Sequence, residues 1–323
     1  MDTAAFRSDL ELIPETLGAL ADAVDAGLDG LDRLPMLAAS RVLVLGMGSS
    51  RYAADVVARR YRAVDAQVMV ELASVALLPP AAPDLAVVAV SATGGSVEVL
   101  RAIERYRGTG RLVAVTNRAD SELARAADVV VPLHAGVEAS GVACRTFRAT
   151  FAVLDQVLAE LLGTAPEARF DPAALRAAAD TSAHLLEASA DWLAPMADLL
   201  AGPMGTWALA PAERASSAQQ SALMLREVPR RAAFASETGD WSHVDVYLTK
   251  TQDYRALVFA GSAWDAQALE WMAMRSSRFA SIGRDLPGAE LTLRFPGDED
   301  DTVAALSEVL VGELVADHWL RQG

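Results

Sequence analysis

The chain has 323 residues, of which 28 are Lys or Arg and 43 are Asp or Glu, so its formal net charge is −15. This length favours about two domains, and the negative charge argues against non-specific binding of nucleic acid. Lys250 is the only lysine and Cys144 the only cysteine. Intrachain disulfides and cysteine-cluster metal sites are therefore excluded, and a Schiff base could form only at Lys250.

The termini and apolar stretches predict a cytoplasmic protein. The N-terminus is acidic where a signal peptide needs a basic region. The longest apolar stretch, residues 72–90, contains Pro79, Pro80, Pro83 and Asp84, so it is no membrane helix. We expect no contact with membranes.

The first half of the chain predicts a parallel sheet. Residues 3–38 have apolar residues at helical spacing. Five short apolar runs then alternate with helical patterns, which is typical of a parallel sheet covered on both faces. The runs are residues 41–45, 67–72, 85–90, 111–116 and 129–132, and the helices are 52–63, 97–106, 121–126 and 146–162.

The second half repeats this order more weakly, which suggests an internal duplication. Its predicted strands are residues 206–209, 232–236, 257–261, 278–282 and 291–295, and its helices are 213–227, 266–274 and 303–319, with Thr302 as N-cap. We expect four segments: N-terminal helices (1–40), a first α/β domain (41–165), a helical connector (166–200) and a second α/β domain (201–323).

Two loops at strand ends carry small polar residues and glycines before a helix, residues 46–50 and 91–96. Hydroxyls and backbone N–H groups at such a place can surround a phosphate without a basic side chain. The alternative is that Ser and Thr only cap the helices while the glycines form turns. Neither loop matches a nucleotide motif, so we expect no nucleotide cofactor.

The second loop resembles a known family. Residues 91–96, Ser-Ala-Thr-Gly-Gly-Ser, resemble the S-x-S-G-x-T phosphate loop of SIS (sugar isomerase) domains. Val115-Thr116-Asn117 and Glu138 with Gly141-Val142-Ala143 resemble later segments of the same domain. Over about residues 40–320 the pattern is similar to the double-SIS isomerase part of glucosamine-6-phosphate synthase and to related sugar-phosphate isomerases and deaminases.

This resemblance implies two three-layer α/β/α domains, each with a five-stranded parallel sheet, after N-terminal helices. It implies a homodimer with sites near the subunit interface and a small sugar phosphate as ligand, with no metal. The residues that it places on the phosphate or the sugar are Ser49, Ser50, Ser91, Thr93, Gly94, Ser96 and Val142.

The resemblance also implies two catalytic residues, Glu227 and His243. Glu227 ends a stretch similar to the family's K-x-K-E, although Met224 replaces a lysine, and His243 matches the histidine of G-E-x-x-H-G-P. From the residues alone, Glu227 could equally form a surface ion pair, and His243 could be an exposed loop residue. Arg145 is either an ordinary helix-start arginine or a phosphate ligand, and Cys144 fits a small buried residue.

The implied reaction is aldose–ketose isomerisation, or isomerisation or deamination of an amino-sugar phosphate, through an enediol or enediolamine. Glu227 would move the proton between C1 and C2, and His243 would open the ring. We expect no glutaminase activity from this chain. A non-catalytic sugar-phosphate-binding or regulatory protein is the alternative, motivated by Met224 and by the absence of the synthase's C-terminal lysine tail. A partner-dependent enzyme is a third interpretation.

Overall fold

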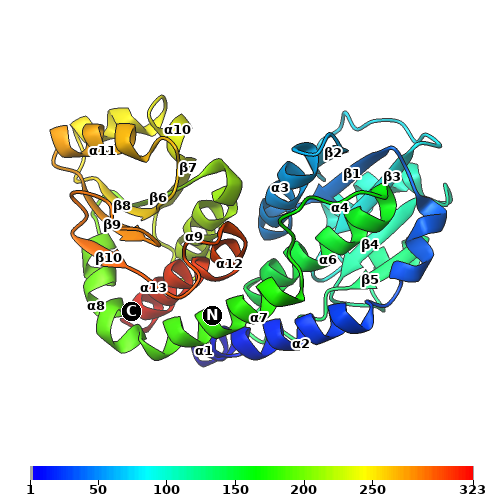
Figure 1. Ribbon diagram of the computed structural model, residues 1–323, viewed down its shortest axis with the longest axis horizontal. Helices are drawn as coiled ribbons and strands as arrows, with labels where there is room; N and C mark the ends of the chain where they lie inside the picture. Colours follow the sequence, from blue (N-terminus) through cyan, green and yellow to red (C-terminus); the bar gives the residue numbers. More distant parts are fainter. Residues whose placement is uncertain (1–2, 323) are drawn as a thin grey trace. The chain divides into compact units, whose positions relative to one another are not determined.

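The computed structural model describes residues 3–322, and the chain divides into two compact units. We call Glu15–Arg176 the central unit and Met1–Pro14 together with Ala177–Gly323 the terminal unit (Figure 1). The chain passes between the units within helices α2 (Ile13–Ala26) and α7 (Pro172–Glu187). Each unit contains one sheet, and each is described separately.

The central unit is built on a five-stranded parallel sheet in the order β2-β1-β3-β4-β5. Its strands are β1 (Arg41–Gly46), β2 (Gln67–Leu72), β3 (Leu85–Val90), β4 (Leu112–Thr116) and β5 (Val129–Pro132). The other elements are α3 (Gly48–Arg62), α4 (Val97–Ile103), α5 (Glu122–Ala126), α6 (Arg145–Leu162) and the 3₁₀ helices η1 (Leu31–Leu37) and η2 (Glu104–Tyr106).

The central strand β3 shows why this sheet forms. All six residues of its sequence LAVVAV are buried, as expected for a parallel strand with helices on both faces. Alternate residues point to opposite faces, so Leu85, Val87 and Ala89 join the core that contains Val99 and Ile103 of α4. Helices α3 and α6 pack against each other, and α4 packs against α5. These layers leave the carboxyl ends of the strands for loops.

The terminal unit repeats this topology, since its parallel sheet has the order β10-β9-β8-β6-β7. Its strands are β6 (Thr206–Ala210), β7 (Ala233–Glu237), β8 (Arg255–Phe259), β9 (Arg278–Ile282) and β10 (Leu291–Leu293). Its helices are α1 (Thr3–Glu11), α8 (Ser189–Leu200), α9 (Ala215–Glu227), α10 (Thr238–Trp241), α11 (Asp265–Met274), α12 (Asp301–Ser307) and α13 (Val309–Gln322), with 3₁₀ helices η3 (Ala212–Arg214) and η4 (Asp245–Lys250). Read from β7, the strand order equals that of the central sheet read from β2.

The predicted α/β fold with two five-stranded parallel sheets is confirmed. The predicted N-cap Thr302 is wrong, because Asp300 occupies that position and its carboxylate accepts the N–H groups of Thr302 and Val303 at 2.7 and 3.3 Å. The helix predicted over residues 303–319 is interrupted at Glu308 and forms α12 and α13. The strands and helices of the central unit begin and end within a few residues of their predicted positions.

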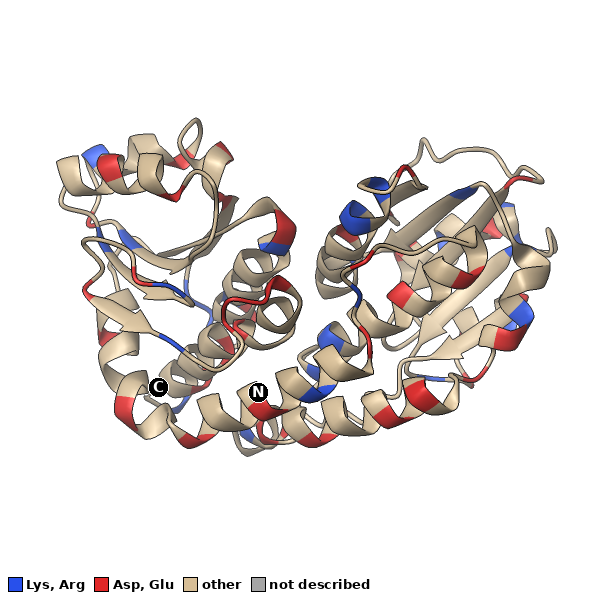
Figure 2. Cartoon of the chain, viewed as in Figure 1, with Lys and Arg blue, Asp and Glu red and all other residues tan. Residues whose placement is uncertain are grey.

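Asp and Glu residues occur in both units, as Figure 2 shows in red. Among residues 3–322, no helix combines the length and the apolar character that crossing a membrane requires.

Candidate functional site

The loop after β3 brings Ser91 and Ser96 together. Their hydroxyl oxygens lie 3.2 Å apart, and the Gly94 N–H donates to the Ser91 hydroxyl at 3.1 Å. Ser91 is buried, whereas Ser96 is half-buried at the N-cap of α4, where it makes no side-chain capping bond. Capping of α4 therefore does not explain the Ser96 hydroxyl, which lies with Ser91 at the carboxyl end of β3.

Gly94 gives this loop its shape. Its φ is +63°, and a Cβ there would lie 2.1 Å from the Ser121 hydroxyl and 3.1 Å from that of Thr116. The Gly94 carbonyl accepts the N–H of Leu123 at 3.0 Å, and the Ser121 hydroxyl caps α5. The glycine is therefore required both by its left-handed backbone and by its close packing against the end of β4 and the start of α5.

The open side of the loop consists of Thr93 and Gly95. Both are exposed, and the Gly95 N–H donates to the Thr93 hydroxyl oxygen at 3.3 Å. A threonine hydroxyl that accepts one hydrogen bond still has its own O–H to donate. Thr93 can therefore present a donor outward, beside the pair of Ser91, which is buried, and Ser96, which is half-buried.

The loop after β1 lies next to this one, because β1 and β3 are adjacent parallel strands. Ser49 is buried and Ser50 half-buried, both in the first turn of α3. The N-cap of α3 is Met47, which offers no side-chain acceptor to the first N–H groups of the helix. The first turn therefore provides backbone donors and the positive end of a helix dipole at the carboxyl edge of the sheet.

Glu138 caps α6, a role that the sequence did not reveal. One carboxylate oxygen accepts the N–H groups of Cys144, Arg145 and Thr146 at 2.8, 2.6 and 3.0 Å, and the other accepts the Thr146 hydroxyl at 2.7 Å. Val142, which the resemblance places on the sugar, is buried, and its N–H donates to the Ser140 hydroxyl at 3.2 Å. The first turn of α6 is thus occupied by a carboxylate of the chain itself.

Arg145 holds the loop before α6. Its guanidinium is buried and donates to the carbonyls of Ala135 and Val137 at 2.8 and 2.5 Å. Asn117, at the end of β4, clamps the same loop by donating to the Gly136 carbonyl at 2.5 Å and accepting the Ala135 N–H at 3.1 Å. These contacts favour the structural interpretation of Arg145. The sequence placed Asn117 in a segment that resembles the family, directly after a buried strand, but gave no sign of these contacts.

Cys144 is buried, as expected for a small apolar residue, and it lies at the N-cap of α6. Glu227 is the last residue of α9, and its side chain is exposed. Met224, one turn earlier, is fully buried. The structure therefore places Glu227 at the surface of the terminal unit, whereas the methionine that replaces the family's lysine belongs to the core.

His243 lies in a turn directly after α10, and its side chain is exposed. Its backbone N–H donates to the Asp240 carbonyl at 2.9 Å. The turn is anchored by Trp241, which is buried and donates its indole N–H to the Tyr254 hydroxyl at 2.6 Å, and by the Glu237 carboxylate, which accepts the Asp240 N–H at 2.8 Å. The exposed imidazole of His243 therefore lies on a turn that Trp241 and Glu237 hold in place.

The single lysine follows this turn in the chain. Lys250 ends η4, is exposed, and has its ammonium 5.6 Å from the centre of the Tyr247 ring, a cation–π contact. Within the described part of the chain, no group of three or more His, Cys, Asp or Glu side chains is placed to hold a metal ion.

The predicted site residues fall into two sets. The phosphate candidates lie in the central unit, where adjacent strands bring the two loops together, and Glu227 and His243 lie in the terminal unit, on α9 and after α10.

Comparison with known proteins identifies the central part of the chain. Residues 36–160 match the model of the SIS domain family. The isomerizing glutamine–fructose-6-phosphate aminotransferase of Aeropyrum pernix is 29% identical over 221 residues, which is 66% of this chain and 36% of that protein. The same enzyme of Pyrobaculum aerophilum is 27% identical over 242 residues, 73% of this chain and 40% of that protein. The chain therefore spans well under half the length of these relatives.

Solved structures share the whole fold. The C-terminal domain of glucosamine-fructose-6-phosphate aminotransferase from Francisella tularensis has a TM-score of 0.83 at 15% identity and covers 99% of this chain and 97% of its own. Tagatose-6-phosphate ketose/aldose isomerase from Escherichia coli has a TM-score of 0.78 at 17% identity, with coverage of 100% and 95%. The match of residues 36–160 to the SIS domain family and the two parallel sheets of the chain are consistent with a double-SIS protein.

Proposed function

We propose that the chain binds a sugar phosphate at the loops 46–50 and 91–96 of its SIS domain. The observation that carries this proposal is the loop after β3, where Ser91 and Ser96 meet at 3.2 Å behind the exposed Thr93. Hydroxyls and backbone N–H groups are suitable donors for phosphate oxygens. Ser49 and Ser50 at the start of α3 add donors from the adjacent strand.

We further propose that the bound sugar phosphate undergoes isomerisation between aldose and ketose, or isomerisation or deamination if it carries an amine. Such a reaction moves a proton between C1 and C2 and needs a second group to open the ring. Glu227 is assigned the proton transfer and His243 the ring opening. Both side chains are exposed, Glu227 at the end of α9 and His243 in the turn after α10. The relatives from Aeropyrum pernix and Pyrobaculum aerophilum are isomerizing aminotransferases, which supports this class of reaction.

The reaction is tested by incubating the protein with fructose-6-phosphate and with glucosamine-6-phosphate in D₂O and following the NMR spectrum. Deuterium at C2, or release of ammonia, is the expected result. Glu227→Gln should abolish it, while Glu270→Gln, which changes an exposed glutamate of α11, should leave it intact. Full activity in Glu227→Gln would contradict the assignment of the base.

The binding loop is tested separately by calorimetry with the same esters. Ser91→Ala with Thr93→Ala should weaken binding by at least about tenfold, since each lost hydrogen bond to a charged group costs about 1.5–3 kcal/mol. Thr292→Ala, on the exposed side of β10, is the matched control. An unchanged affinity in the double variant would refute the proposed loop.

A binding-only protein is the second candidate, and the fully buried Met224 favours it, because the family's lysine has no counterpart there. Ester binding without deuterium exchange would support it and would exclude the isomerase. The family resemblance also leads us to propose that the protein is cytoplasmic and forms a homodimer. Light scattering of the purified protein tests the homodimer.

A further inference from the structure

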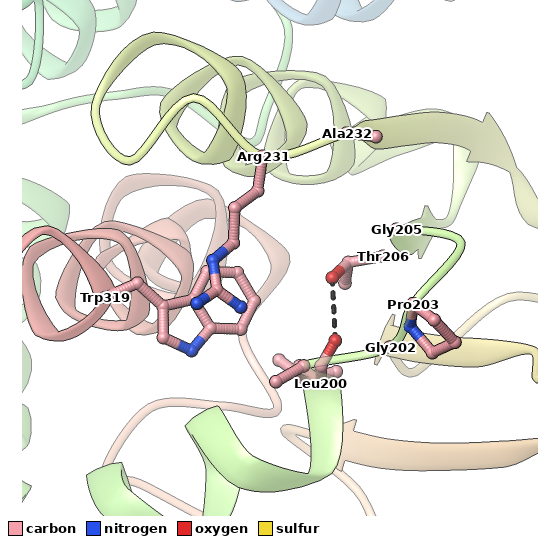
Figure 3. A pocket seen from close by; sticks show the side chains of 9 residues that line it. Leu200, Gly202, Pro203, Gly205, Thr206, Arg231, Ala232 and Trp319 are labelled. Carbon is pink, nitrogen blue, oxygen red and sulfur yellow. Dashed lines mark hydrogen bonds between the residues drawn. The ribbon is translucent and has the colours of Figure 1, made fainter. Parts of the chain in front are cut away.

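A pocket lies in the terminal unit at the amino-terminal edge of the sheet, near the first residues of β6 and β7. Its volume is about 270 Å³, and Figure 3 shows its side chains. The walls come from the end of α8, the segment before β6, the segment between α9 and β7, and α13. The lining residues are Leu200, Ala201, Gly202, Pro203, Gly205, Thr206, Arg231, Ala232 and Trp319.

The charged group of this pocket is Arg231. Its guanidinium carbon lies 4.3 Å from the centre of the buried Trp319 ring, which holds the guanidinium by a cation–π contact (Figure 3). The side chain is exposed, and among the described residues no carboxylate forms an ion pair with it. A guanidinium has five N–H donors in a planar fork, so this one is oriented and available to an anion.

Several backbone and hydroxyl groups of the pocket lining are already paired. The Leu200 carbonyl accepts both the Gly202 N–H at 2.7 Å and the Thr206 hydroxyl at 2.9 Å. The Thr206 N–H donates to the Ala232 carbonyl at 3.1 Å, and the Gly205 N–H to the Gly202 carbonyl at 3.3 Å. Among the residues that line the pocket, Arg231 is the one that carries a charge.

Arg255 packs against Gly202, where an added Cβ would meet its side chain at 3.0 Å. It is not a second donor for a ligand, because its guanidinium is engaged elsewhere. It bonds the carbonyls of Asp198 and Leu199 and the carboxylate of Asp253. The exposed guanidinium of Arg231 thus lies over the Trp319 ring in a pocket whose lining also includes the apolar side chains of Leu200 and Pro203.

We propose that this pocket binds a small monocarboxylate with an apolar body. A carboxylate matches the guanidinium fork with two parallel hydrogen bonds, and the apolar body fits the remaining walls. A phosphate dianion fits less well, because the pocket has no second cation and contains the carbonyl end of α8, the negative end of its dipole.

Occupation of this pocket would bear on the end of α9. The Arg231 N–H donates to the Leu225 carbonyl at 2.9 Å, so the segment that carries the guanidinium folds back on the last turn of that helix. A ligand clamped by Arg231 would fix the segment that follows Glu227. Binding itself does not depend on the sugar-phosphate proposal and is measured without any ester.

The test uses benzoate as the probe, with its neutral analogue benzamide and inorganic phosphate as comparisons, followed by ligand-observed NMR. We expect saturable benzoate binding below about 10 mM and no binding of benzamide. Arg231→Gln should weaken benzoate binding by about tenfold or more. Arg231→Lys keeps the charge and loses the planar fork, so its affinity for benzoate should lie between those of the parent and Arg231→Gln. Arg230→Gln removes the neighbouring exposed charge outside the pocket and should bind as the parent does.

Three results would overturn the proposal: equal benzoate binding by the parent and Arg231→Gln, no saturable binding of benzoate, or phosphate binding that depends on Arg231 and exceeds that of benzoate. Thermal melting of the variants checks the fold. Because the side chain of Arg231 is exposed, both glutamine variants should melt within a few degrees of the parent.

Discussion

At the scale of single residues, two adjacent glycines of the phosphate-loop candidate have different physical roles. Gly94 has positive φ and no room for a side chain, whereas a Cβ on Gly95 would meet its nearest neighbour, the Thr93 hydroxyl, at 4.0 Å. Only Gly94 is therefore required by the backbone and by packing, although both occur in the same motif.

Gly94→Ala should lower the free energy of unfolding by about 2 kcal/mol or more, because the new Cβ overlaps Ser121 and the backbone is strained. Gly95→Ala should change it by less than about 0.5 kcal/mol. Urea unfolding followed by circular dichroism measures both. Equal effects of the two substitutions would contradict the described loop geometry.

At the scale of elements, α6 begins on a carboxylate that the chain supplies. Glu138 pairs with three consecutive N–H groups and a hydroxyl of the first turn. The sequence placed this helix correctly but did not assign the cap, because Glu138 lies in an irregular loop and reaches forward six to eight residues.

Glu138→Ala should destabilise the protein by about 1–3 kcal/mol, since it leaves several donors of the first turn without their acceptor. Glu122→Ala removes an exposed carboxylate from the first turn of α5 and should cost less than about 0.5 kcal/mol. Chemical denaturation compares them. If only Glu122→Ala lowered the free energy of unfolding, Glu138 would not be the cap of α6.

A second element-scale prediction concerns the starts of β1 and β3. Arg41 donates two hydrogen bonds to Asp84 at 2.8 and 2.9 Å, and these bonds, more than the opposing burial, lower the pKa of Asp84. A lowered pKa in the folded state gives stability that is present above the unfolded value, about 3.9, and is lost as the pH falls through the folded value.

The stability difference between the parent and Asp84→Asn should therefore favour the parent at neutral pH and shrink as the pH falls below about 4. Urea titrations at several pH values measure it. A difference that grows on acidification would have the wrong sign and would exclude the assigned pairing.

The element boundaries also show what the sequence can and cannot reveal. Buried parallel strands such as β3 are continuous apolar runs, so they are recognisable by themselves. The helix breaks at Glu308, whose carboxylate pairs with the distant Arg214, and that contact depends on the tertiary structure. The Asp300 cap is local, and the wrong choice of Thr302 shows that several polar residues compete for one cap. Ser91 and Ser96 were found by motif, whereas the contact of Asn117 with residues 135 and 136 arises only once β4 and β5 pair.

At the scale of the whole molecule, the net charge of −15 opposes an anionic ligand. The phosphate-loop candidates are hydroxyls and backbone N–H groups, while the nearby Arg145 is engaged with backbone carbonyls and Arg51 with Asp55 at 2.6 Å. Binding of a phosphate ester should therefore not depend on a cationic clamp.

We expect the affinity for a sugar phosphate to stay constant or rise when KCl is increased to about 0.5 M, because salt screens the repulsion of the whole chain. Calorimetric titrations at low and high KCl test this, with neutral free sugar as the control. A steep fall in affinity with salt would indicate that positive side chains hold the phosphate.

The position of Lys250, exposed at the end of η4 and seven residues after His243 in the chain, makes it a reporter of local opening. A protease specific for lysine has a single cleavage site in this chain, and cutting there yields residues 1–250 and 251–323. Cleavage requires the segment to leave its helical turn, so its rate under native conditions measures how often that turn unfolds. A ligand that orders the His243 turn would slow the cleavage after Lys250, which is measured on a gel without a label or an engineered site.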